Sequence, residues 1–374
     1  MRARLIVLAL CLGLVAGLLG GCAPQAAPVD GGGAAAPAEG DQEDGQTPAA
    51  PAGEVFEWKM QTYYPTADPA YGAMQGVTER IAEATGGRLL IECFPGGSIV
   101  PQGKELDSLN QGVFEMAFVS HGFQTHLFPA AFLFAQRVGG LTPIQAMTWL
   151  RYGGGNELAA EMYSPLGGIH YVATPFVHPP EVWCHSNKKL ESLDDFQGLK
   201  IRSPGDSGAI LSRMGASSVS LPGSEIYEAA QRGVIDATEY ITQATNWDMG
   251  FQEVFKYMYM SPTRAPSDTI AVWANASAWE AIGPDMQAIV EACMNEETLR
   301  WYAWSLENDA IALQKFKDYG TIVEPIPEDI DARLVEVAAE YFAEKAAGDE
   351  MFRRVLESQD AWKELCESQG DWAT

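Results

Sequence analysis

A segment of this chain occurs twice at a constant spacing, and that repeat constrains the fold more than any other feature of the sequence. Residues 100–115 align without gaps with residues 221–236, and Gly112 matches Gly233 at a distance of 121 positions. Each copy predicts a loop marked by proline, a short helix that ends at glycine, and a strand that carries one acidic residue. Two copies do not make a solenoid. The repeat therefore indicates two lobes of similar design, although common strand and turn patterns could also produce such a similarity.

The hydrophobic pattern before the first copy is typical of an α/β fold. Residues 56–62 alternate apolar and polar side chains, as a strand does. Apolar residues then recur at helical spacing over residues 71–84, two glycines end the helix, and residues 88–94 form a second predicted strand. The chain therefore opens with a strand, a helix and a strand.

The body of the chain, residues 54–374, is longer than one hydrophobic core usually serves. We expect two lobes, discontinuous in sequence, at about residues 54–175 and 176–300. Residues 329–368 have the apolar spacing of long helices, whose apolar faces need a partner surface. That surface is either the body of the same chain or a second subunit.

The N-terminus has the pattern of an export signal. Arg2 and Arg4 precede an apolar run shorter than the roughly 20 residues needed to span a bilayer, and Cys22 follows two glycines. This cysteine resembles the cleavage site of bacterial lipoproteins. We expect residues 1–21 to be removed and Cys22 to carry lipid, with an uncleaved anchor helix as the alternative. Residues 22–53 lack aromatic residues and predict a disordered tether, so the protein is expected in the periplasm or on the outer face of the membrane.

The composition and the motif content exclude several classes of function. The formal net charge of −26 disfavours nucleic acid and anionic lipid as partners. It does not disfavour a small anionic ligand, because one arginine in a cleft acts at short range. The sequence has no GxSxG, HExxH, P-loop or GxGxxG motif, and His178 and His185 fit no zinc spacing. The chain is therefore predicted not to be an enzyme, while the four cysteines of the body are left open as free thiols or disulfides.

Polar residues at the predicted carboxyl ends of strands define a candidate site, because ligands bind at these ends in open α/β sheets. The ends are residues 120–123 in the first lobe and Glu239 with Tyr240 in the second. Arg202 ends another predicted strand. Its guanidinium offers two parallel donors to a carboxylate, and when buried it requires an anionic ligand or a protein acid. From the residues alone, a ligand clamp and a structural salt bridge are both consistent with Arg202.

From about Phe56 to the C-terminus, the chain resembles the substrate-binding component of tripartite ATP-independent periplasmic (TRAP) transporters. The resemblance rests on four motifs in order: Gly198-Leu199-Lys200-Ile201-Arg202, Met214-Gly215-Ala216, Leu221-Pro222 and Gly233-Val234-Ile235-Asp236-Ala237-Thr238-Glu239. It implies a two-lobed α/β fold like that of periplasmic binding proteins, with a hinge and a long C-terminal helix. It also implies the membrane subunits of a TRAP transporter as partners, and a homodimer joined through the C-terminal helix.

Within that family, Thr238-Glu239-Tyr240 is similar to the branch that binds 2-oxo and 2-hydroxy acids with a bridging metal ion. The resemblance implies that Arg202 clamps the ligand carboxylate and that Glu239 and the main-chain carbonyl of Tyr240 bind the metal. The branch has a glutamine where this chain has Glu181, and an acid there would repel a carboxylate unless a cation lies between them. Asp268 lies near the last metal ligand of the branch, or is a solvated loop acid. The number of acids favours Ca²⁺ over Na⁺.

These features together predict a binding protein for a small monocarboxylate such as lactate or pyruvate. Phe123 and the Tyr63–Tyr64 pair could form the wall of the cleft in the first lobe, or could be ordinary core aromatics. One alternative is a ligand with an amino group that pairs with Glu181 and Asp268 without a metal. Another is an exported acidic hydrolase, with Glu181 and Glu239 as an acid–base pair.

Overall fold

The structure, a computed structural model, describes residues 53–368 and residue 370. The predicted signal peptide, Cys22 and the tether up to residue 52 lie outside these residues. Within the described part of the chain, no helix combines the length and the apolar character needed to cross a membrane. The predicted lipid anchor therefore stays a prediction.

Two sheets form the framework of the body, and we call each sheet with its helices a lobe. The first sheet has the order β2-β1-β3-β10-β4, with β1 parallel to β2 and β3 and β10 antiparallel to both of its neighbours. The second has the order β11-β9-β5-β8-β6-β7, with β6 parallel to β7 and β8. The strands are β1 (Phe56–Thr62), β2 (Leu89–Phe94), β3 (Met116–Ser120), β4 (Ile169–His178), β5 (Cys184–Ser186), β6 (Lys200–Arg202), β7 (Ser217–Val219), β8 (Ala237–Thr238), β9 (Tyr257–Met260), β10 (Asp268–Asn275) and β11 (Ile322–Pro325).

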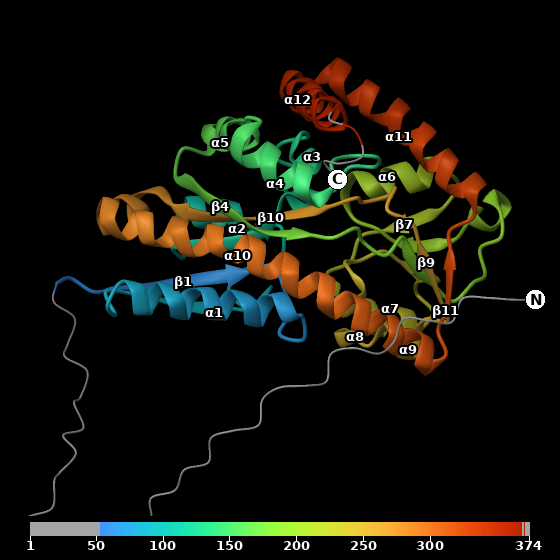
Figure 1. The fold of residues 1–374 in the computed structure, drawn as a ribbon, viewed down its shortest axis with the longest axis horizontal. Helices are drawn as coiled ribbons and strands as arrows, with labels where there is room; N and C mark the ends of the chain where they lie inside the picture. The colour runs from blue at the N-terminus through green and yellow to red at the C-terminus, as the bar shows by residue number, and fades with distance from the viewer. Residues whose placement is uncertain (1–52, 369, 371–374) are drawn as a thin grey trace, which may run out of the picture. The chain divides into compact units, whose positions relative to one another are not determined.

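The helices cover both sheets (Figure 1). The first of them, α1, begins after Asp68, whose side chain accepts a hydrogen bond from the Ala70 amide, and it buries Met74, Val77 and Ile81 against the first sheet. The helices are α1 (Pro69–Ala84), α2 (Glu105–Asn110), α3 (Ala131–Ala135), α4 (Pro143–Tyr152), α5 (Gly155–Tyr163), α6 (Gly205–Arg213), α7 (Ile226–Gln231), α8 (Gln243–Asp248), α9 (Phe251–Val254), α10 (Ala276–Tyr319), α11 (Glu328–Gly348) and α12 (Glu350–Glu367).

The repeat found in the sequence is present in the structure. The helices α2 and α7 occupy equivalent positions of the two copies, and each is followed by a glycine with positive φ, 73° at Gly112 and 69° at Gly233. The acidic residue before the next strand accepts the same kind of main-chain hydrogen bond in both copies. Glu115 accepts a hydrogen bond from the amide of Lys59 at 2.7 Å, and Asp236 accepts one from the amide of Lys200 at 3.1 Å. Each copy thus joins its strand to the neighbouring strand, β1 or β6.

Three segments between residues 53 and 319 cross between the lobes. Residues 179–183 connect β4 to β5, and residues 261–267 connect β9 back to β10; we call these the two linkers. The third is α10, which runs beside β4 and α1 in the first lobe and beside α8 in the second (Figure 1). Its helical path is interrupted at Gly283, where φ is 75° and ψ is 166°. The long C-terminal helix that the family resemblance implied is thus confirmed, although the sequence analysis placed it at residues 329–368 and did not locate α10.

The C-terminal region predicted at residues 329–368 consists of two helices, α11 and α12, separated at Asp349, which caps α12. Their apolar side chains pack on the body of the same chain: α11 lies against α6, and α12 against α3, α4 and α5. Phe342 and Phe352 are buried in this contact. The sequence left open whether this region packs on its own chain or on a second subunit. The structure shows these helices packed on the body of the same chain. The two-lobed α/β architecture is confirmed.

Candidate ligand-binding site

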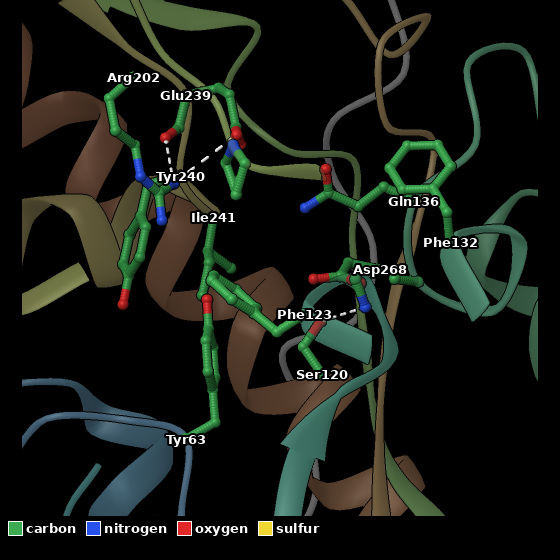
Figure 2. Close-up of a pocket in the computed structure, with 13 residues that line it drawn as sticks. Tyr63, Ser120, Phe123, Phe132, Gln136, Arg202, Glu239, Tyr240, Ile241 and Asp268 are labelled. Carbon is green, nitrogen blue, oxygen red and sulfur yellow. Dashed lines mark hydrogen bonds and ion pairs between the residues drawn. The ribbon is translucent and has the colours of Figure 1, made fainter. Parts of the chain in front are cut away.

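A small cavity lies between the lobes, at the carboxyl ends of the parallel strands β1, β3, β6 and β8. It contains about 20 Å³ of space for the centre of a water molecule. The lobes are close together beside it, since a Cβ added to Gly205 in the second lobe would lie 3.1 Å from the carbonyl oxygen of Gly122 in the first. The lining residues are Tyr63, Ser120, Gly122, Phe123, Phe132, Ala135, Gln136, Arg202, Pro204, Glu239, Tyr240, Ile241 and Asp268 (Figure 2). The predicted cleft at the strand ends is thus present, in a closed arrangement.

Arg202, the last residue of β6, is 1% exposed and is held by the main chain of its own lobe. Its Nε donates to the carbonyl oxygen of Leu221 and its Nη1 to that of Glu239, both at 3.0 Å. Its Nη2 has no hydrogen-bond partner among the described residues. A buried guanidinium with one free donor group beside a cavity can still bind an anion.

Glu239 follows β8 and lies beside Arg202 in the second lobe (Figure 2). Its Oε1 lies 3.6 Å from Nη1 of Arg202, beyond hydrogen-bond distance, and has no hydrogen-bond partner in the described chain. Its Oε2 lies 3.3 Å from Nη1 of a second arginine, Arg264. One oxygen of this carboxylate is therefore fixed and the other remains able to accept.

Asp268, the first residue of β10, lies in the first lobe and is 3% exposed. It is buried and lines the cavity, so the structure does not place it as a solvated loop acid. Burial raises its pKa to about 7, although a hydrogen bond from Gln136 opposes the shift. Its Oδ1 has no hydrogen-bond partner in the part of the chain that the structure describes. Gln136, which the sequence analysis did not single out, lies beside it (Figure 2).

Glu181 lies behind the cavity wall, not among the residues that line it. Its Oε2 is 2.5 Å from Nη2 of Arg264 and its Oε1 accepts from Gln136 at 2.8 Å. Burial by itself would lower the pKa of Arg264, but Glu181 and Glu239 outweigh it and raise that pKa, so the arginine stays cationic. The sequence analysis missed Arg264, because nothing in the sequence links it to an acid 83 positions earlier.

Aromatic side chains form the wall of the cavity in the first lobe. Tyr63 and Phe123 both line it, with ring centroids 5.3 Å apart. Tyr64, which we expected at the cleft, lies one layer deeper and is fully buried, and its hydroxyl is 2.9 Å from Nε2 of His178. Of the predicted Tyr63–Tyr64 pair, it is Tyr63 that reaches the cavity.

Tyr240 connects the site to the first lobe. Its hydroxyl donates to Oδ2 of Asp68 at 3.2 Å, and its ring centroid lies 5.6 Å from the guanidinium carbon of Arg202. Gly223 approaches the same ring so closely that an added Cβ would lie 2.7 Å from the hydroxyl oxygen. The phenol is therefore fixed between the two lobes.

The acids of the site offer oxygen ligands for a cation. Among the described residues, no group of three or more His, Cys, Asp and Glu side chains lies close enough together to hold a metal ion. Two buried carboxylate oxygens without a hydrogen-bond partner, Oε1 of Glu239 and Oδ1 of Asp268, nevertheless belong to residues that line one cavity. Hard cations such as Ca²⁺ and Na⁺ prefer oxygen ligands of this kind. The residues present therefore fit a cation that a ligand or main-chain oxygens help to coordinate.

The chain is similar in sequence to solute-binding proteins of bacteria. Residues 60–349 match the sequence model of the bacterial extracellular solute-binding proteins, family 7. A monocarboxylate 2-oxoacid-binding periplasmic protein of Nostoc sp. is 28% identical over 306 residues, which cover 82% of this chain and 84% of that protein. A C4-dicarboxylate-binding periplasmic protein of Rhodobacter capsulatus is 26% identical over 258 residues, 65% of this chain and 72% of that protein.

Solved structures share the fold. A TRAP solute-binding protein from Bordetella bronchiseptica, with copurified calcium and picolinate, superposes with a TM-score of 0.79 at 26% identity, over 86% of this chain and 94% of that one. A TRAP periplasmic solute-binding protein from Pseudoalteromonas atlantica, with sodium and pyruvate, gives a TM-score of 0.81 at 23% identity, over 86% of this chain and 97% of that one. The predicted similarity to a periplasmic binding protein fold is confirmed.

Proposed function

The chain belongs to the bacterial extracellular solute-binding proteins, family 7, and from this membership and the site we propose that it captures a small monocarboxylate for uptake by a TRAP transporter. The ligand class is a 2-oxo or 2-hydroxy acid such as pyruvate or lactate. The Nostoc relative is named as a binding protein for monocarboxylate 2-oxoacids, and the P. atlantica structure contains bound pyruvate.

One observation carries the proposal: three buried polar atoms without hydrogen-bond partners among the described residues belong to side chains around one cavity. They are Nη2 of Arg202, a donor, and the two acceptors Oε1 of Glu239 and Oδ1 of Asp268. Buried polar groups are normally paired, so an unpaired set of donors and acceptors around a cavity calls for a ligand. A carboxylate accepts from Arg202, and a cation satisfies the acids.

We propose Ca²⁺, or alternatively Na⁺, as that cation, held by Glu239, Asp268 and the main-chain carbonyl of Tyr240. When bound, the ion would offset the repulsion between these acids and the ligand carboxylate. A bound cation would favour the ionised form of Asp268, and with all three acids (Glu181, Glu239, Asp268) ionised beside two arginines (Arg202, Arg264) the site has one net negative charge. The ligand adds a second negative charge, so a divalent ion neutralises the filled site and Ca²⁺ is favoured. Both oxygens of Glu181 are already engaged, and it supports the site from behind.

The small cavity also favours a short ligand with one carboxylate. Tyr63, Phe123, Phe132 and Ile241 contribute apolar walls, and Arg202 is the single lining residue with a cationic side chain. Arg264 lies behind the wall with its donors already engaged. A second carboxylate on the ligand would thus find no cationic partner among the described lining residues.

Three further elements are part of the proposal. Lipid attachment at Cys22 would keep the protein at the membrane, and the membrane subunits of the transporter would receive the ligand. A homodimer through the C-terminal helices is the third. Leu365 of α12 is 55% exposed and offers a site of contact, although most of the apolar residues of α11 and α12 already pack on their own chain.

Calorimetry on the purified body, residues 54–374, tests the ligand class. With Ca²⁺ present, pyruvate and lactate should bind at least tenfold more tightly than succinate or alanine. Tighter binding of alanine would support the ligand with an amino group instead, and tighter binding of succinate would contradict the single-carboxylate site. Chromatography of the ligand after overnight incubation should recover it unchanged, whereas turnover would contradict the role as a binding protein.

A further inference from the structure

We propose that Arg264 is a positioning residue of this site, which couples the arrangement of the two linkers to the orientation of the Glu239 carboxylate. The proposal rests on the proposed function, because the oxygen that Arg264 leaves free is the one assigned there to the cation. Arg264 itself is not among the residues that line the cavity.

The contacts of Arg264 join segments that are distant in the sequence. It lies on the linker of residues 261–267 and is 1% exposed. Its Nε donates to the carbonyl oxygen of Trp183 at 2.9 Å and its Nη2 to that of Val182 at 3.1 Å, both on the other linker. Nη2 also pairs with Glu181 of that linker, at 2.5 Å. One guanidinium therefore ties together both linkers that cross between the lobes.

The remaining donor group, Nη1, reaches both walls of the cavity. It donates to Oε1 of Gln136 in the first lobe at 3.3 Å and lies 3.3 Å from Oε2 of Glu239 in the second. A guanidinium has five N–H groups, and here all three nitrogens have acceptors. Arg264 is thus saturated, whereas Arg202 keeps Nη2 free. The two buried arginines are distinguished by this difference, with Arg202 available to a ligand and Arg264 fixed by protein groups.

The orientation of Glu239 follows from these contacts. Because Arg264 fixes Oε2, the other oxygen, Oε1, is left without a hydrogen-bond partner among the described residues, in a residue that lines the cavity. If the lobes rotate apart, the two linkers move, and the guanidinium that spans them moves with them. The Oε2 atom of Glu239 then loses its contact with Arg264, so the carboxylate is no longer oriented toward the cation. Lobe closure and cation binding are coupled in this way.

The test compares Arg264→Lys with wild type and with a double variant, Glu181→Gln/Arg264→Gln, that removes the charges of Glu181 and Arg264 together. Lysine keeps the charge but cannot hold two carbonyls and two acids in one plane. Calorimetry with pyruvate is run over a range of Ca²⁺ concentrations. We expect both variants to bind one pyruvate per chain at least tenfold more weakly, with a reduced dependence of the dissociation constant on Ca²⁺. A purely structural role would lower the melting temperature and the active fraction, leaving the dissociation constant and its Ca²⁺ dependence unchanged.

Arg213→Lys is the matched control, because Arg213 forms a two-point contact with Glu344 at 3.1 and 2.6 Å on the surface. It should bind pyruvate as wild type does. If wild type itself binds no monocarboxylate, the proposed function fails. If wild type binds but Arg264→Lys matches it in affinity and in Ca²⁺ dependence, only the role of Arg264 fails.

A measurement on wild type decides the matter if the variants do not fold. The amide of Glu181 donates to the carbonyl oxygen of Ala265, which joins the two linkers directly. Its hydrogen exchange should slow at least tenfold when pyruvate and Ca²⁺ are added together. Unchanged exchange in the presence of bound pyruvate would show that the linkers do not respond to the site, and would overturn the proposal.

Discussion

The hydroxyl of Tyr240 in the second lobe donates to Asp68 in the first, at 3.2 Å and in a fully buried position. This bond joins the two lobes through a residue that lines the cavity, so it is present while the lobes are closed. Tyr240→Phe removes the hydroxyl but keeps the ring beside Arg202 and the main-chain carbonyl. We expect pyruvate affinity to fall by about 1–2 kcal/mol, since a buried acceptor is left without its donor. Calorimetry measures the loss, and small-angle scattering should show a larger open fraction.

Tyr227→Phe serves as the control for that variant. Tyr227 also donates to a carboxylate, that of Glu253 at 2.6 Å, but both residues lie in the second lobe on the surface. Its affinity for pyruvate should equal that of wild type. Equal losses in the two variants would mean that the Tyr240 hydroxyl has no special role in closure.

Gly223→Ala should disturb the same bond from the other side. The added Cβ would lie 2.7 Å from the Tyr240 hydroxyl, so the ring must shift and its hydrogen bond to Asp68 is disturbed. We expect a loss of affinity similar to that of Tyr240→Phe, and a smaller loss when the alanine is introduced into the phenylalanine variant, because the two changes act on one contact. Gly72→Ala, inside α1 with no atom within 4 Å of the new Cβ, should leave affinity unchanged. Additive losses in the double variant would contradict the explanation.

The C-terminal helices should stabilise the body of their own chain. Phe352 of α12 is fully buried, so Phe352→Ala should lower the free energy of unfolding by about 3–5 kcal/mol. Leu299→Ala, at a residue of α10 that is 69% exposed, should change it by less than about 0.5 kcal/mol. Urea unfolding measures both values. Light scattering on the same samples tests the proposed homodimer, which predicts twice the chain mass for wild type.

The stability of the protein should depend on His178 below pH 6.5. Burial lowers its pKa to about 3, and Trp301 Nε1 donates to its Nδ1 at 3.3 Å, so the folded state holds the ring neutral. The unfolded chain takes up a proton below pH 6.5, which means that the stability due to a neutral His178 is present above pH 6.5 and is lost as the pH falls towards 3. Between pH 7 and pH 5, wild type should lose about 2 kcal/mol relative to His178→Gln. A constant difference between the two proteins would show that the ring takes up a proton in the fold as readily as in the unfolded chain.

Much of the fold could be predicted because local signals agree with the tertiary structure. Proline and glycine mark the two copies of the repeat, and Gly112 and Gly233 have the positive φ that a helix end requires. The position of α10 in the sequence escaped prediction for a physical reason: Trp301 is buried on one side, while Leu299 and Leu306 are exposed on the other, at 69% and 51%. Apolar residues on both sides leave no single periodic stripe to recognise.

The site was predictable only in part. Arg202 and Glu239 follow strands whose ends could be located from the sequence, and the structure places both at the cavity. Arg264 and Gln136 meet Glu181 through contacts between segments far apart in the chain, which no spacing indicates. Glu181 looked like a cation ligand because the acid was visible in the sequence and its arginine was not.

The central claim, that a cation and Arg202 together hold a small carboxylate, is tested most directly by titrating pyruvate into wild-type protein with Ca²⁺ and again after chelation with EDTA. The structure predicts one site per chain and at least a tenfold loss of affinity on chelation, restored when Ca²⁺ is returned. Tight binding that chelation leaves untouched, in a buffer free of sodium, would contradict the proposed cation and leave Glu239 and Asp268 without their assigned role.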